Sequence, residues 1–192
     1  MNRYSTFILA AVFVAAASLN AFAQQAQPGA APQAQPGAAP QNANPMSAEL
    51  KQAYTNIKNN LTRMADKMPE EHYGFKATAD IRSFGELVAH VADSQAGACS
   101  AVNGEPKALN AAQKTTKADL VAALKESFAI CDKAFDALTD AKAAEMITVR
   151  NRQRSRLGAL AGTVSHSNEE YGYMAVYMRL KAIVPPSSER RN

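Results

Sequence analysis

The sequence lacks the short motifs that identify several common classes of enzyme. It contains no glycine-rich phosphate loop, no Cys-x-x-Cys pair and no serine, histidine and aspartate in the order of a hydrolase triad. It therefore gives no support to a P-loop nucleotide-binding enzyme, a thioredoxin-like oxidoreductase or a triad hydrolase.

Long hydrophobic runs are also scarce, and the main one lies at the N-terminus. The basic segment Met1–Arg3 precedes an apolar run from Phe7 to Ala17, and Ala21–Ala23 resembles a cleavage site. The run is shorter than the roughly 20 residues that a membrane-spanning helix needs, and no cysteine follows the site to carry a lipid. We therefore expect residues 1–23 to be a cleaved signal peptide, and the mature protein to be periplasmic or secreted without a membrane anchor.

An excess of charge of one sign is missing as well. The chain has 21 lysines and arginines against 17 aspartates and glutamates, and loss of Arg3 with the leader would reduce the excess further. So small an excess does not indicate binding to nucleic acid. The one local concentration is Arg150, Arg152, Arg154 and Arg156. This run fits either a gate for an anion or substrate, or a solvated loop leading into a helix. Arginines two positions apart lie on one face only if the chain is extended.

Cysteine is limited to two residues, Cys99 and Cys131. In an oxidising compartment such a pair tends to form a disulfide when its distance allows, and the alternative is two buried free thiols. We expect the disulfide, which in the chain-entropy model stabilises the fold by about 3 to 4 kcal/mol.

The segment after the leader is poor in charge and in large apolar side chains. The sequence AQPGAAPQ occurs twice in tandem between Ala26 and Gln41. Such a composition cannot bury enough surface to offset the entropy of ordering, so residues 24–44 are predicted to be a disordered spacer.

What is present from residue 45 onward is helical periodicity, which predicts four helices and no sheet. The first helix is expected from a cap at Ser47 to Pro69, the second from a capping box at Ser83-Phe84-Gly85-Glu86 to Gly104, the third from Thr116 to about Asp140, and the fourth from about Gln153 to Ala182. The predicted fold is an all-α four-helix bundle over residues 45–188, followed by a polar tail at 189–192.

The cysteines constrain how these helices run. Cys99 lies about 16 residues beyond the Ser83 cap and Cys131 about 15 beyond the Thr116 cap, so the two lie at similar heights along their helices. Two helices can be bridged at equal heights from their starts only if they are parallel. We therefore predict a crossover connection between the second and third helices, in an up-down-down-up bundle.

The candidate functional residues are three side chains on two helices. His166 and Glu170 lie one turn apart at the border of the apolar face of the fourth helix, and His90 lies in the second turn of the second. Imidazole and carboxylate groups are metal ligands, so a convergence of the three would form a divalent-metal site. Asn168, Tyr171 and Tyr173 are candidates to line its approach, whereas His72 is expected to be exposed in a loop.

Three segments resemble the DinB/YfiT-like metalloenzyme family: RSFGELVAHVAD at 82–93, KADLVAALKESFAICD at 117–132 and HSNEEYGYMAVYMRLKAIVPPSS at 166–188. The resemblance implies the same up-down-down-up bundle, with a divalent metal, most often zinc or nickel, held by His90 and by an H-x-x-x-H pair on the last helix. The second member of that pair is Glu170 here. A carboxylate can replace imidazole as a ligand, or the change marks a degenerate site whose carboxylate keeps the histidines protonated.

Three functions fit these observations. The first is a metal-dependent enzyme, either a transferase or a hydrolase, that acts on an unidentified small molecule. The second is a non-catalytic binding module for a small ligand. The third is a structural bundle in which the three residues form a buried polar network. No nucleic-acid or membrane partner is expected, and a homodimer is a possible assembly. The thiol cofactors used by some relatives are cytosolic, so export argues against them and makes a hydrolytic or an unknown reaction at least as plausible as thiol transfer.

Overall fold

The four predicted helices are present in the computed structural model, which describes residues 43–189. They are α1 (Pro45–Lys67), α2 (Phe84–Val102), α3 (Lys117–Asp136) and α4 (Arg156–Leu180). The predicted signal peptide, nearly all of the predicted spacer and residues 190–192 lie outside the described residues. None of the helices within residues 43–189 is long and apolar enough to cross a bilayer.

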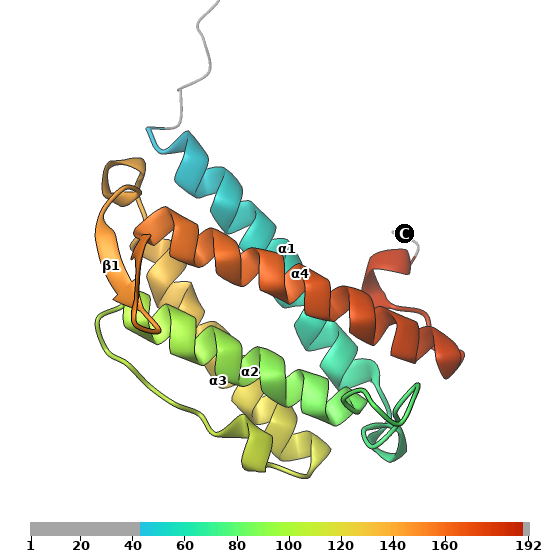
Figure 1. The fold of residues 1–192 in the computed structure, drawn as a ribbon. Coiled ribbons are helices and arrows are strands. Elements are labelled where there is room, and N and C mark those ends of the chain that lie inside the picture. The colour runs from blue at the N-terminus through green and yellow to red at the C-terminus, as the bar shows by residue number, and fades with distance from the viewer. Residues whose placement is uncertain (1–42, 190–192) are drawn as a thin grey trace, which may run out of the picture. The chain divides into compact units, whose positions relative to one another are not determined.

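The helices follow the predicted up-down-down-up course (Figure 1). α1 and α4 run in one direction, and α2 and α3 run together in the other. The connection from α2 to α3 therefore crosses back along the bundle, and the carboxylate of Asp93 fixes it by accepting bonds from the backbone N–H groups of Ala111 (2.8 Å) and Ala112 (3.0 Å). This topology places α2 beside α4, which is the arrangement that the three candidate ligands require.

Cys99 and Cys131 lie at disulfide distance between the parallel helices α2 and α3. Their Cα atoms are 4.9 Å apart, and both residues are buried. The two positions therefore face each other at equal heights, as the argument for parallel helices requires.

The N-terminal caps of two helices, α2 and α3, form as their local sequences predict, and that of α1 does not. The Ser83 hydroxyl accepts a bond from the Glu86 backbone N–H (3.2 Å), and the Glu86 carboxylate accepts one from the Ser83 N–H (2.6 Å), which completes the predicted capping box. Thr116 caps α3 as predicted. The prediction for Ser47 was wrong: α1 begins at Pro45 after Asn44, and Ser47 lies in the first turn, where its N–H and hydroxyl donate to Asp140.

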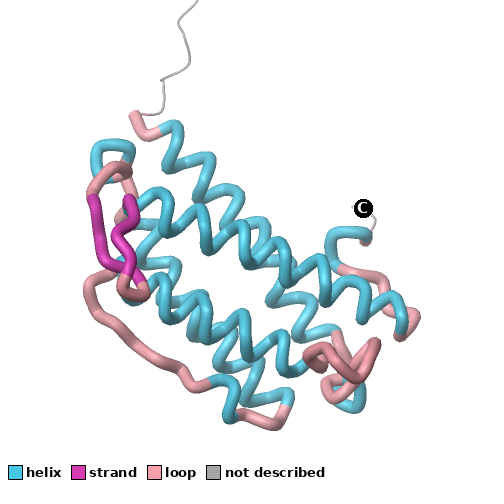
Figure 2. Tube along the Cα trace, in the orientation of Figure 1, coloured by secondary structure: helices cyan, strands magenta, loops and turns pink. Residues whose placement is uncertain are grey.

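A two-stranded hairpin before α4 is the main feature that the sequence analysis missed. Strands β1 (Met146–Val149) and β2 (Arg152–Ser155) form this hairpin, which Figure 2 draws in magenta. They pair antiparallel, with Val149 opposite Arg152 and Ile147 opposite Arg154. Strands of four residues are too short for their periodicity to be recognised. α4 consequently begins at Arg156 rather than near Gln153, because Ser155 accepts a bond from the Gly158 N–H and caps the helix there.

The bundle core is continuous across the four helices and holds one face of α4. Tyr54 of α1 stacks on Phe135 of α3, with ring centroids 3.9 Å apart. Along α4 the buried stripe contains Thr163, Glu170, Met174 and Tyr177. The C-terminal segment also packs on the bundle, because Glu189, assigned to the tail from sequence, forms ion pairs with Lys67 and Arg63 of α1.

Candidate metal centre

His90 is positioned by the start of α2. The capping box fixes the helix at Ser83. Leu87, which lies one turn before His90 on the same face, and the adjacent residue Val91 are buried in the core. The imidazole itself is only partly buried, with 32 % of its side chain exposed. Its ring therefore lies at the edge of the core, where it faces α4.

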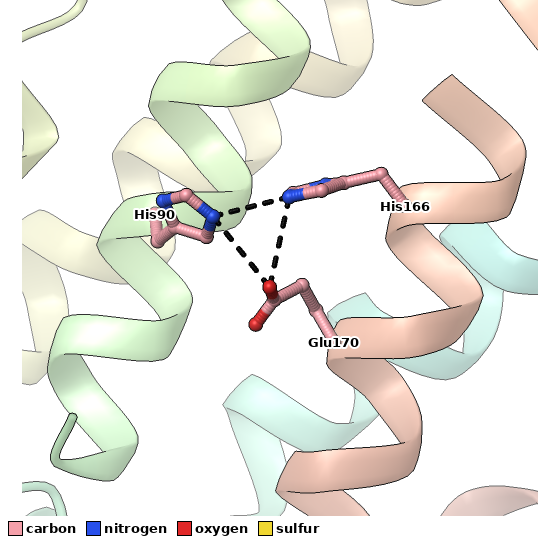
Figure 3. A group of neighbouring side chains, drawn as sticks. All are labelled: His90, His166 and Glu170. Atoms are coloured by element: carbon pink, nitrogen blue, oxygen red, sulfur yellow. Dashed lines mark hydrogen bonds and ion pairs between the residues drawn. The ribbon is translucent and has the colours of Figure 1, made fainter. Parts of the chain in front are cut away.

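His166 and Glu170 project from α4 toward that ring. Figure 3 shows the imidazole of His90 reaching from α2 to meet His166 and Glu170, which lie one turn apart on α4. Glu170 is the more deeply placed of the two, with 7 % of its side chain exposed against 31 % for His166. The structure thus brings together all three residues that the sequence nominated as ligands.

The three ligand atoms form a nearly regular triangle. The Nε2 atoms of His90 and His166 are 3.1 Å apart, and the Oε1 atom of Glu170 lies 3.5 Å from the first and 3.6 Å from the second. Ligands about 2.0–2.1 Å from a tetrahedral zinc ion lie about 3.3 Å from one another. The spacing of the triangle therefore matches the edge of a metal coordination polyhedron without any rearrangement of the helices.

The protonation of His90 also suits a ligand. Burial lowers the pKa of His90 below its usual value, and the charges of Arg82, His166 and Arg150 lower it further, whereas the Glu170 carboxylate acts in the opposite direction. Burial is the largest of these effects, so the imidazole tends to the neutral form that binds metal ions. The lowered pKa of His90 therefore argues against the alternative of a degenerate site in which Glu170 keeps this histidine protonated.

Glu170 supplies the clearest indication of a candidate cation site. Its Oε2 atom is buried and has no hydrogen-bond partner among the described residues. Burying a carboxylate with an unpaired oxygen is costly, and proteins normally avoid it by pairing the charge or by using it to bind a metal. The donor set and the unpaired oxygen together fit a divalent ion, and His90, His166 and Glu170 could hold one.

The approach to the site differs from the one predicted. The hydroxyl of Tyr171 bonds to Ser187, that of Tyr173 to Glu169, and the Asn168 amide to the backbone of Val164. None of these three lines the cavity that His166 borders. His72, expected to be exposed, is partly buried in a 3-10 helix (Glu70–His72) and is not part of the ligand group.

The residues that do line the approach come from α2 and from the hairpin. A cavity of about 440 Å³ lies beside His166, and its walls include Gln95 of α2, Thr163 of α4, and Arg150, Arg152 and Arg154 of the hairpin. The arginine spacing was visible in the sequence, but its role depended on an extended chain that the sequence did not reveal. Gln95 had no distinct signal, because two other polar residues, Asp93 and Ser94, precede it directly in α2.

Comparison with known proteins agrees with this fold. The family profile of the DinB superfamily matches residues 53–174, a range that contains all three candidate ligands. A DinB-like protein from Bacillus cereus superposes with a TM-score of 0.63 at 15% identity, over 72% of this chain and 95% of that one.

Two further solved structures are similar. A DinB-like protein from Bacillus subtilis gives a TM-score of 0.59 at 20% identity, over 75% of this chain and 99% of that one. A conserved protein from Enterococcus faecalis gives 0.57 at 15% identity, over 70% and 95%. No curated protein matches the chain significantly. At these identities the structural matches show the fold and do not extend to a particular activity.

Proposed function

Because the chain belongs to the DinB superfamily, we propose that it is an exported metalloprotein that binds one divalent ion through His90, His166 and Glu170 and acts as a hydrolase or transferase. The observation that carries the proposal is the buried, unpaired carboxylate oxygen of Glu170 beside two converging imidazoles. A structural polar network would leave no such oxygen, since its members would satisfy one another.

The chemistry of the ligands limits the choice of metal. Two imidazole nitrogens and one carboxylate oxygen suit zinc, nickel, iron or manganese better than calcium or magnesium, which prefer oxygen ligands alone. Zinc or nickel is the proposed ion. Three protein ligands leave at least one coordination position free, which is the arrangement of catalytic rather than structural sites.

The arrangement favours catalysis over simple metal storage because one of the ligands, His166, borders a cavity. When bound at such a centre, a divalent ion polarises a substrate oxygen and lowers the pKa of a water molecule or thiol. The protein residues hold the ion through two partly exposed imidazoles, while the deeper Glu170 supplies the negative charge. His166 borders the cavity through which a small substrate would reach the centre.

Export is supported by the predicted signal peptide together with the cysteine pair. Cys99 and Cys131 lie at disulfide distance, and such pairs are typical of periplasmic and secreted proteins. The cytosolic thiol cofactors used by some relatives are scarce in that setting, so hydrolysis is the favoured reaction.

The metal site is tested with protein purified from the periplasm of an expressing bacterium. We expect about one equivalent of zinc or nickel per chain by elemental analysis, and its loss in His166→Ala, because two remaining ligands bind divalent ions weakly. His72→Ala is the matched control, since it removes an imidazole outside the ligand group, and it should keep the metal.

An absence of metal in wild-type protein after titration with zinc and nickel, or equal metal content in His166→Ala and wild type, would overturn the proposal. With the metal established, hydrolysis of ester, amide and phosphate substrates by loaded and metal-depleted protein separates an enzyme from a binding module. An enzyme loses turnover on depletion and regains it when the metal is restored.

A further inference from the structure

The hairpin presents its arginines to the cavity because β2 is extended. Successive side chains of a strand alternate between its two faces, so Arg152 and Arg154 share one face. Their partners on β1 are Val149, which is buried, and Ile147, which packs against the core. The shared face therefore looks toward α2 and α4, and both arginines line the cavity beside His166.

Two of the arginines are held in place by the helices on either side. Arg150, at the tip of the hairpin, donates from its guanidinium to the Ser94 carbonyl of α2 (3.3 Å). Arg154 donates to the Gly158 carbonyl of α4 (2.8 Å). Its guanidinium rests on Gly162, where a Cβ atom would come within 3.1 Å of it, so glycine leaves room for this close approach. These contacts fix the guanidinium groups at the cavity wall.

The charge of this wall is not neutralised by the protein. Among residues 43–189, no aspartate or glutamate lines the cavity, and Arg150, Arg152 and Arg154 form no ion pair. The neighbouring Arg156, by contrast, bonds to Glu145 at 3.0 Å. Three cations around one concave surface raise the local concentration of small anions and offer paired N–H donors to them.

Gln95 gives an independent indication that the cavity receives a ligand. Its side chain is 1% exposed and lines the same cavity. Neither its amide oxygen nor its amide nitrogen has a hydrogen-bond partner in the described part of the chain. A buried amide without partners is unfavourable, and a polar group of a bound molecule would satisfy it.

We infer that the cavity bounded by Gln95, Thr163 and the three hairpin arginines binds the anionic group, carboxylate or phosphate, of a small organic substrate. Arg150 and Arg152 contact the anion, Arg154 adds charge, and Gln95 bonds to a polar atom of the substrate. The volume of about 440 Å³ limits the molecule to a small metabolite. The inference rests on the proposed metal centre for the position of the reacting group, although the anion contacts themselves do not involve the metal.

Titration calorimetry with malonate and with inorganic phosphate tests the inference on full-length mature protein, both metal-loaded and metal-depleted. We expect at least one of the two anions to bind and Arg152→Gln to weaken that binding by about 10- to 100-fold, the range for loss of one charge-assisted contact. Arg152 is exposed, and its side chain forms no hydrogen bond or ion pair with the residues that the structure describes, so the variant should fold normally. Arg63→Gln, which removes a guanidinium from α1, should bind like wild type.

Measurements on metal-loaded and on metal-depleted protein distinguish failure of the anion site from failure of the metal site. Binding of neither anion, or equal binding by Arg152→Gln and wild type, overturns the inference even when elemental analysis finds metal in both proteins. Absence of metal overturns the proposed function instead, and arginine-dependent binding to metal-depleted protein then still supports the anion site. Preference for malonate or for phosphate identifies the anionic group.

Discussion

Replacement of Glu170 by leucine is expected to stabilise the metal-free protein and to abolish its stabilisation by metal. The wild-type carboxylate is buried with an unpaired oxygen, and exchanging such a group for an apolar one of similar volume gains about 1–3 kcal/mol in the free energy of unfolding. Zinc or nickel at 100 times its dissociation constant stabilises the wild type by about 2.7 kcal/mol. The variant should lose that gain, since it lacks the charged ligand.

Denaturant unfolding with chelator and with added metal measures both effects. Glu170→Gln is the matched control: it removes the charge but keeps a buried polar group, so its metal-free stability should lie below that of Glu170→Leu. A metal-free leucine variant less stable than wild type would show that Glu170 belongs to a satisfied polar network, and would favour a structural role over a metal site.

Reduction of the Cys99–Cys131 pair is expected to lower the free energy of unfolding by about 3 to 4 kcal/mol. The estimate follows from the sequence separation of 32 residues, because the bridge restricts the unfolded chain far more than the folded one. The folded bundle should persist after reduction, since both cysteines pack in the core.

Two measurements check this prediction. Thiol titration of denatured, unreduced protein should find no reactive thiol, and two would contradict the bridge. The denaturant midpoint should fall on addition of reductant in wild type and stay constant in Cys99→Ala/Cys131→Ala, which serves as the control for effects of the reductant itself.

The bundle could be predicted from the sequence because its determinants are local. The capping box at Ser83 and the Thr116 cap each form within a single turn, and the apolar spacing of each helix is long enough to be recognised. The relative direction of α2 and α3 does not depend on local sequence. It could still be predicted, because a disulfide between Cys99 and Cys131 at equal heights requires the two helices to be parallel.

The hairpin could not be predicted because its signals are short and atypical. Its two turn residues, Arg150 and Asn151, have φ angles of 49° and 60°, a conformation in which glycine is the usual residue. Because neither turn residue is glycine, the sequence does not indicate a tight turn at this position. Because β2 was not predicted, the sequence also could not show that Arg152 and Arg154 lie on one face of an extended strand.

The ligands could be nominated but the walls of their cavity could not. His166 and Glu170 are one turn apart on one helix, so spacing alone places them together. His90 was nominated as the third ligand from another helix, and the family resemblance supported that choice. Gln95 lies on a different helix from those two, and its burial and unpaired amide are visible only after the elements have packed.

The most direct test of the central claim is X-ray absorption spectroscopy at the metal edge of the zinc- or nickel-loaded protein. The ligand triangle predicts two imidazole nitrogens and a carboxylate oxygen at about 2.0–2.1 Å for zinc. His90→Ala keeps two ligands and binds metal weakly, so it is measured at a metal concentration high enough to load it, and its spectrum should then show one imidazole fewer. A spectrum with oxygen ligands alone, or one that His90→Ala leaves unchanged, would show that the metal binds elsewhere and would contradict the account.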